Sequence, residues 1–137
     1  MPRFPQPYDS FTSGRATFRF YLADCLDLLD QPPRGSIDTI VTSPPYNLGV
    51  RYRTYDDSIP RDRYLTWTGK WVERASGALS GDGSLFLNVG AKPTDPWTAL
   101  DVAQAARPYL RLQNTIDCIK SIAIEKTLLR TPAGLSD

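Results

Sequence analysis

One short segment limits the fold more than any other, the apolar and β-branched run from Ser36 to Thr42 that leads directly into two prolines. A run of this kind is typical of a strand buried on both faces, as in parallel sheets. Proline has no N–H for the sheet ladder, so the strand must end before Pro44 and Pro45. The sequence therefore predicts a buried strand followed by a stiff turn.

Predicted strands and helices alternate on both sides of this run. The further strands are predicted over residues 16–23 and 84–89, the helices over 24–31, 61–80 and 96–107, and one or two more strands within 112–124. The helix over 61–80 is the clearest, because apolar residues recur at helical spacing between Pro60 and Gly81. This order indicates βαβ units, so we expect an α/β fold with a partial, mostly parallel, doubly wound sheet. In such sheets the site lies at the carboxyl ends of the strands.

The chain divides into three predicted parts. Residues 1–15 are rich in proline, serine and threonine and are expected to form an arm before the domain. Residues 16–126 hold the alternating elements and form the expected domain. Residues 127–137 have no clear period and are expected to form an irregular end.

Composition removes several function classes. The 137 residues suffice for one small domain, and 16 basic against 15 acidic residues give no field of one sign that would attract nucleic acid or membranes. Histidine is absent and the two cysteines, Cys25 and Cys118, are far apart, which removes the usual zinc motifs and the Ser-His triad. We therefore expect no metal. Since no apolar run reaches the length of a membrane span, we also expect no membrane partner and a cytoplasmic protein.

The turn Ser43-Pro44-Pro45-Tyr46 carries the candidate chemistry. The prolines fix the backbone, so their carbonyl groups point in set directions with no competing N–H. Ser43 adds a hydroxyl, and Tyr46 adds an aromatic face. Acceptors clustered around an exocyclic amino group orient its lone pair and stabilise the positive charge that develops on nitrogen as it attacks an electrophile. The alternative interpretation is a strand-ending turn with a packed tyrosine.

The segment from Thr42 to Asn47 resembles motif IV of the DNA amino-methyltransferases, in which Asp, Asn or Ser precedes two prolines and an aromatic residue. The version with Ser is most similar to the N4-cytosine members of that family, and the version with Asp is commoner among N6-adenine members. Upstream, LADCLDLL resembles the family's G-D-C-L-x-L-L segment. The resemblance extends over about residues 18–124.

This resemblance implies a fold of the Rossmann-like methyltransferase type that uses S-adenosyl-L-methionine. Residues 16–126 would be the catalytic half of its domain, acting on double-stranded DNA with the target base flipped out. Ser43 and the Pro44 carbonyl would bind the amino group, Pro45 would keep the turn rigid, and Tyr46 would stack on the base.

Two further groups of residues are assigned by this comparison or by their composition. Asp24, with Cys25 and Leu26 beside it, matches the part of the family segment that lies near the adenosine of the cofactor. A helix N-cap is the alternative that explains Asp24 without any cofactor, and both roles can hold together. Arg51, Tyr52 and Arg53, with Tyr55 nearby, combine charge and aromatic rings as a DNA contact does, but a solvated loop is an equal alternative.

The family's glycine-rich cofactor loop, F-x-G-x-G, does not occur in the 137 residues. The chain thus resembles a truncated member, which leaves open a fragment, a degenerate product, or one subunit whose second chain supplies this loop and target recognition. Three hypotheses follow: an N4-cytosine methyltransferase or part of one, with N6-adenine as the near variant; an inactive remnant; and a non-catalytic DNA- or partner-binding module.

Overall fold

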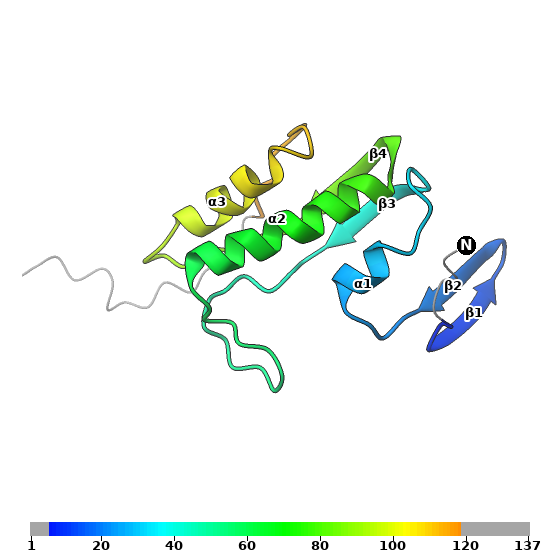
Figure 1. Cartoon of the computed structure of the whole chain (residues 1–137), viewed down its shortest axis with the longest axis horizontal. Coiled ribbons are helices and arrows are strands. Elements are labelled where there is room, and N and C mark those ends of the chain that lie inside the picture. Colours follow the sequence, from blue (N-terminus) through cyan, green and yellow to red (C-terminus); the bar gives the residue numbers. More distant parts are fainter. Residues whose placement is uncertain (1–5, 119–137) are drawn as a thin grey trace, which may run out of the picture.

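The computed structural model describes residues 6–118. In chain order, the elements are β1 (Asp9–Ser13), β2 (Ala16–Phe20), α1 (Cys25–Leu29), β3 (Ile37–Thr42), α2 (Arg61–Ala78), β4 (Leu79–Leu87) and α3 (Trp97–Ala106) (Figure 1). Helix α2 runs along the centre of the molecule, with α3 beside it and the β3–β4 sheet behind it, while the β1–β2 hairpin stands apart.

The pairing of β3 with β4 is parallel, as predicted. In its regular part, Thr39 faces Ser84 and Thr42 faces Leu87, and the ladder continues beyond both strands because the Asn88 N–H donates to the Thr42 carbonyl at 2.9 Å. Two parallel neighbours need a long crossover, which α2 provides. The predicted β-α-β unit is therefore confirmed for β3, α2 and β4.

The core lies between this sheet and the helices. Trp71, Val72 and Ala75 of α2 are buried at its centre. The partly buried side chains packed around them are Leu26, Leu29, Ile40, Trp67, Leu85, Leu87, Ala106 and Leu110. Trp67 and Trp71 therefore belong to the apolar stripe of the helix that faces the core.

The other face of the sheet departs from the prediction. Val41 and Phe86, which alternate with the core residues, are 76% and 53% exposed. The described residues therefore contain a two-stranded parallel sheet covered on one face, and the prediction that the 36–42 strand is buried on both faces is wrong for this part of the chain. Of the predicted doubly wound sheet, the described residues therefore contain only one β-α-β unit.

The N-terminal region is a second correction. Strand β1 lies inside the segment predicted to be an arm before the domain, and β2 pairs antiparallel with β1 and does not join the parallel sheet. Gly14, with φ of 59°, begins a two-residue turn of the kind that closes tight hairpins. Phe11 then stacks on Phe18 and Phe20, with ring centroids 4.7 and 5.9 Å away. Local turn chemistry and aromatic pairing thus determine the partner of β2.

Smaller differences concern the ends of elements. Helix α2 ends at Ala78 and β4 begins at once with Leu79, five residues before the strand predicted from residue 84. Of the strands predicted within 112–124, none forms over residues 112–118, and residues 119–124 lie outside the described part.

Over residues 6–118, no helix combines the length and apolar character needed to cross a membrane.

The centre of the core provides a stability test. Val72 has no exposed surface, so Val72→Ala removes buried methyl groups and leaves a cavity. We expect the free energy of unfolding to fall by about 2 kcal/mol. The matched control is Glu73→Ala, at an exposed position on the same helix, which should change that free energy by less than about 0.5 kcal/mol. Urea unfolding followed by circular dichroism measures both, and equal effects would contradict this packing.

Candidate functional site

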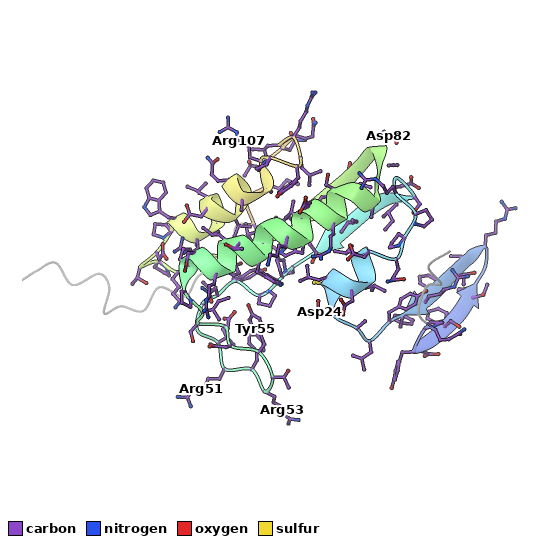
Figure 2. The ribbon with its side chains drawn as sticks, in the orientation of Figure 1. Asp24, Arg51, Arg53, Tyr55, Asp82 and Arg107 are labelled. Atoms are coloured by element: carbon purple, nitrogen blue, oxygen red, sulfur yellow. The ribbon has the colours of Figure 1, made fainter. Side chains whose placement is uncertain are left out.

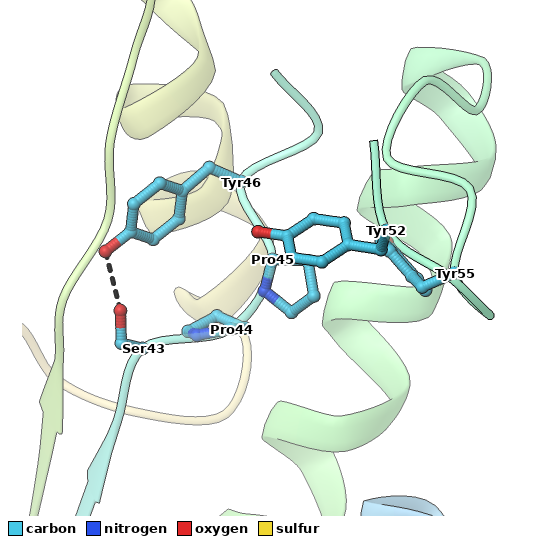
Figure 3. A pocket seen from close by; sticks show the side chains of 6 residues that line it. All are labelled: Ser43, Pro44, Pro45, Tyr46, Tyr52 and Tyr55. Atoms are coloured by element: carbon cyan, nitrogen blue, oxygen red, sulfur yellow. Dashed lines mark hydrogen bonds between the residues drawn. The ribbon is translucent and has the colours of Figure 1, made fainter. Parts of the chain in front are cut away.

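The turn from Ser43 to Tyr46 leaves the carboxyl end of β3 beside the corresponding end of β4. Within it, the Ser43 hydroxyl and the Tyr46 phenol share a hydrogen bond of 2.6 Å (Figure 3). Asn88, just beyond β4, donates from Nδ2 to Ser43 Oγ at 3.4 Å. The two neighbouring strand ends therefore place their first polar side chains together, where the βαβ prediction expected the site.

The backbone of Gly90 packs against the ring of Tyr46. A Cβ atom at Gly90 would lie 2.6 Å from Cδ2 of the Tyr46 ring, closer than real carbon atoms approach. This position therefore needs glycine, because the backbone packs directly on the ring. Gly90 lies between the predicted strand over 84–89 and the predicted helix over 96–107, and no local pattern there indicates its contact with Tyr46.

The two proline carbonyls have different surroundings. The Pro45 carbonyl accepts a hydrogen bond of 2.8 Å from the Tyr64 hydroxyl, which belongs to the buried face of α2. Burial, with the nearby Tyr55, Asp57 and Tyr46, raises the pKa of Tyr64 to about 12. Among residues 6–118, no donor bonds the Pro44 carbonyl. Of the predicted acceptors, the Pro44 carbonyl thus has no donor in this part of the chain, whereas Ser43 Oγ contacts Tyr46 and Asn88, and the Pro45 carbonyl is used to fix the turn.

The segment that follows the turn is tied to a buried carboxylate. Asp57 is 3% exposed, and its Oδ1 accepts from the Asn47 N–H at 3.0 Å. Its Oδ2 accepts from the N–H groups of Leu48 and Val50, both at 3.0 Å. The Asn47 side chain donates in turn to the Ile59 carbonyl at 2.8 Å. The loop therefore closes back on the turn from which it starts.

An open pocket of about 330 Å³ lies between the turn and this loop. Its lining consists of Ser43, Pro44, Pro45, Tyr46, Tyr52 and Tyr55 (Figure 3). All four residues predicted as catalytic thus gather at one pocket, together with one residue predicted to bind DNA. Tyr55, the second aromatic residue of the predicted DNA-contact loop, lines the pocket as well.

The residues predicted to bind the cofactor lie elsewhere. Asp24 caps α1, where its Oδ1 accepts from the Leu26 N–H at 2.8 Å, which confirms the N-cap interpretation (Figure 2). Leu26 packs against the core. Partial burial and the charge of Asp24 raise the pKa of the Cys25 thiol and so keep it neutral. None of the three lines the pocket.

S-adenosyl-L-methionine therefore fits the described residues only in part. The second carboxylate oxygen of Asp24 accepts no hydrogen bond within residues 6–118 and suits a ribose hydroxyl. In this described part of the chain, no loop of repeated glycines lies beside it to let backbone approach a cofactor. Over the same residues, no three His, Cys, Asp or Glu side chains gather as metal ligands.

The predicted DNA-binding residues separate into two groups. Arg51 and Arg53 are exposed at the far end of the loop and point away from the helices (Figure 2). Arg51 forms a backbone bridge with Asp56. Tyr52 instead faces the pocket. The structure thus gathers Tyr52 with the turn and leaves the two arginines in solvent.

An ion-pair cluster that the sequence analysis missed joins two helices near the site. Arg61, the first residue of α2, pairs with Asp95 and Asp101 and also bonds the Thr98 hydroxyl at 3.1 Å. Contact with Arg61 lowers the pKa of Asp95. Because these residues are 34 to 40 positions apart in the sequence, no local pattern indicates the pairing. The cluster fixes the start of α3 against the start of α2.

Replacement of Gly90 tests the packing behind Tyr46. In Gly90→Ala the new methyl group must displace the Tyr46 ring, and we expect the free energy of unfolding to fall by about 1 to 3 kcal/mol. Gly81→Ala is the control, because a Cβ there meets nothing within 4 Å. Guanidinium unfolding gives the energies, and NMR shifts of the Tyr46 ring report the displacement. An unmoved ring in Gly90→Ala would contradict the contact.

The Tyr64 hydroxyl predicts a pH dependence. Between pH 10, near the pKa of an unfolded tyrosine, and pH 12, the unfolded chain loses this proton while the folded chain keeps it. The stabilising contribution is therefore complete below pH 10 and is lost as the pH rises through the folded value. We expect Tyr64→Phe to be less stable at neutral pH by about 1 kcal/mol, through loss of the bond to Pro45, but to lose less stability over this window. Parallel curves of unfolding free energy against pH would refute the assignment.

Comparison with known proteins agrees with this geometry. The family model described as DNA methylase matches residues 37–129, more than half of the chain. The match begins with β3 and includes the turn, the pocket loop, α2, β4 and α3.

Curated relatives of the chain are Type II methyltransferases. M.MjaVI of Methanocaldococcus jannaschii is 53% identical over 57 residues, which cover 42% of this chain and 29% of the relative. M.ScaI of Streptomyces caespitosus is 38% identical over 73 residues, covering 53% of this chain and 23% of the relative. M.HpaI of Haemophilus parainfluenzae is 34% identical over 74 residues, covering 54% and 24% respectively. The matches span less than a third of each relative's length. Together with the turn at the carboxyl end of β3, the family match establishes that this chain belongs to the DNA methylase family.

Proposed function

We propose that this chain carries the base-binding site of a DNA methyltransferase that modifies an exocyclic amino group, with N4 of cytosine favoured over N6 of adenine. The observation that carries the proposal is the gathering of Ser43, Pro44 and Tyr46 at one open pocket at the carboxyl end of β3. The matches to Type II methyltransferases support it.

Each residue of the turn has a defined task in this proposal. The Pro44 carbonyl accepts one N–H of the target amino group. Ser43 Oγ donates its proton to the Tyr46 phenol and accepts from Asn88 with one lone pair, so its second lone pair accepts the other N–H. These contacts hold the nitrogen lone pair toward the electrophile and stabilise the developing positive charge. S-adenosyl-L-methionine, when bound, supplies the methyl group.

Tyr46 holds the ring of the base. Gly90 covers one side of the phenol ring, and the pocket lies along the turn on which Tyr46 is mounted. The hydrogen bond with Ser43 fixes the angle of the ring before any base arrives. A base in the pocket would then stack on a surface that is already oriented, which lowers the entropy cost of binding.

The substrate and partners belong to the same proposal. Double-stranded DNA supplies the flipped base. No F-x-G-x-G loop occurs in the 137 residues, and we propose that the glycine-rich cofactor loop and the target recognition come from outside them, from a second chain or from another segment of the same protein. Residues 16–126 form the catalytic half in this arrangement, and Asp24 is the cofactor contact proposed within it.

Methyl transfer tests the proposal. Transfer of a labelled methyl group to unmethylated DNA is measured with this chain alone and mixed with the protein encoded immediately downstream. We expect Ser43→Ala and Tyr46→Ala each to lower the rate by about 100-fold, because each removes an oriented contact to the transition state. The modified base, identified after digestion, distinguishes N4-methylcytosine from N6-methyladenine.

The matched controls are Ser10→Ala and Tyr8→Ala, at exposed positions in or beside the separate hairpin, which should keep the full rate. Activity that survives in both turn variants would place the chemistry elsewhere. Absence of transfer in every mixture would favour the inactive or binding-module hypothesis.

A further inference from the structure

The loop after the turn, residues 47–59, has features that the proposed function does not use. We propose that Tyr52 is a base-stacking residue that forms the second wall of the pocket, and that Asp57 is the positioning residue that holds it there. This inference rests on the proposed function and extends it to the residues that hold the target base.

Asp57 provides the attachment. Three backbone N–H groups converge on its carboxylate, at 3.0 Å each, and the Gly49 N–H donates to its backbone carbonyl at 2.8 Å. Converging amide groups form a concavity that suits an anion, and hydrogen bonds to a charged acceptor are stronger than neutral ones. Because the carboxylate is buried, these N–H groups have no water to replace it.

The backbone of this segment requires such an attachment. Asn47 has φ of 57° and Gly49 has φ of 77°, both in the left-handed region. Asparagine tolerates that region better than other residues with a side chain, but it still needs surrounding contacts to stay there. The bonds to Asp57 and the bond from Asn47 Nδ2 to the Ile59 carbonyl supply these contacts. The direction of the loop is therefore fixed immediately after Tyr46.

The fixed loop brings two aromatic rings to the pocket. Tyr52 is 54% exposed and lines the pocket, so a large ring faces solvent at a hollow (Figure 3). Tyr55 lies against it edge to face, with centroids 6.1 Å apart and planes at 68°. Tyr55 is itself half-buried, so it supports Tyr52 from the side of the loop. A pocket with Tyr46 at one end and Tyr52 at the other suits a planar ring.

In this proposal Tyr52 binds the base by stacking and does not distinguish an amino group from a carbonyl group. Ser43 and Pro44 make that distinction, because they accept hydrogen bonds from an amino group. Two probes separate these roles. Deoxycytidine has the exocyclic amino group, and deoxyuridine has a carbonyl in its place. Each is titrated into the isotope-labelled chain, and NMR shifts of the pocket residues give the dissociation constants.

We expect Tyr52→Ala to raise the dissociation constants of both nucleosides by about tenfold, because stacking is lost for either ring. Tyr52→Phe, which keeps the aromatic face, should restore binding to within about twofold. Tyr8→Ala, at an exposed tyrosine before the hairpin, is the matched control and should bind as the unchanged chain does.

Asp57→Asn tests the positioning role. Its matched control is Asp56→Asn, which changes an exposed neighbour that accepts hydrogen bonds from Ser58. The amide group can no longer accept at both ends, so hydrogen-exchange protection of the Asn47, Leu48 and Val50 amides should fall at least about tenfold. Protection of the Val72 amide in α2 should stay unchanged. The dissociation constants of both nucleosides should rise as in Tyr52→Ala. A purely structural role would lower protection of α2 as well and leave the Tyr52 variants without effect.

The outcomes separate the two proposals. Unchanged binding in Tyr52→Ala would overturn the inference and leave the proposed function standing. Equal binding of deoxycytidine and deoxyuridine would overturn the proposed amino-group recognition, while the loss in Tyr52→Ala would still support the aromatic wall. If the unchanged chain bound neither nucleoside, both proposals would fail. If Asp57→Asn did not fold, the Tyr52 variants would still decide whether the wall exists.

Discussion

Parallel strands cannot be joined by a tight turn, and this constraint organises the described part of the molecule. The chain that leaves β3 must travel back along the sheet before β4 can pair, and α2 is the element that makes this return. Its apolar stripe then covers the sheet and forms the core with Trp71, Val72 and Ala75. The same pairing places both strand ends side by side, so Ser43 and Asn88 meet although they are 45 positions apart.

The site is built on this frame in successive layers. The sheet fixes where the turn begins, and the two prolines make the turn stiff. Tyr64 of α2 then anchors the Pro45 carbonyl, and Gly90 supports the Tyr46 ring. Asp57 finally fixes the loop that completes the pocket. Each layer depends on the one below it, which is why residues of α2, of the loop and of the segment after β4 are all needed to hold the four-residue turn in place.

Much of this could be predicted where the signal is local. The strand before Pro44 and the helix over 61–80 follow from patterns within a few residues, and both form nearly where expected. The composition of the turn likewise indicated an array of acceptors and an aromatic face. Errors arose where partners compete over distance. The residues of β2 predict a strand, but its pairing with β1 depends on Gly14 and the phenylalanine stack, which a pattern of alternating strands and helices does not reveal.

By itself, the sequence determined the order of strands and helices, the stiff turn and its family resemblance, because spacing, proline geometry and motif composition are properties of adjacent residues. Tertiary structure alone decided which residues share the pocket. Tyr52 and Tyr55 reach it, whereas Asp24, Arg51 and Arg53 do not. Folding brings Asp57 onto the amides beside the turn and Arg61 onto Asp95. These pairings depend on the path of the backbone in three dimensions, which no local pattern encodes.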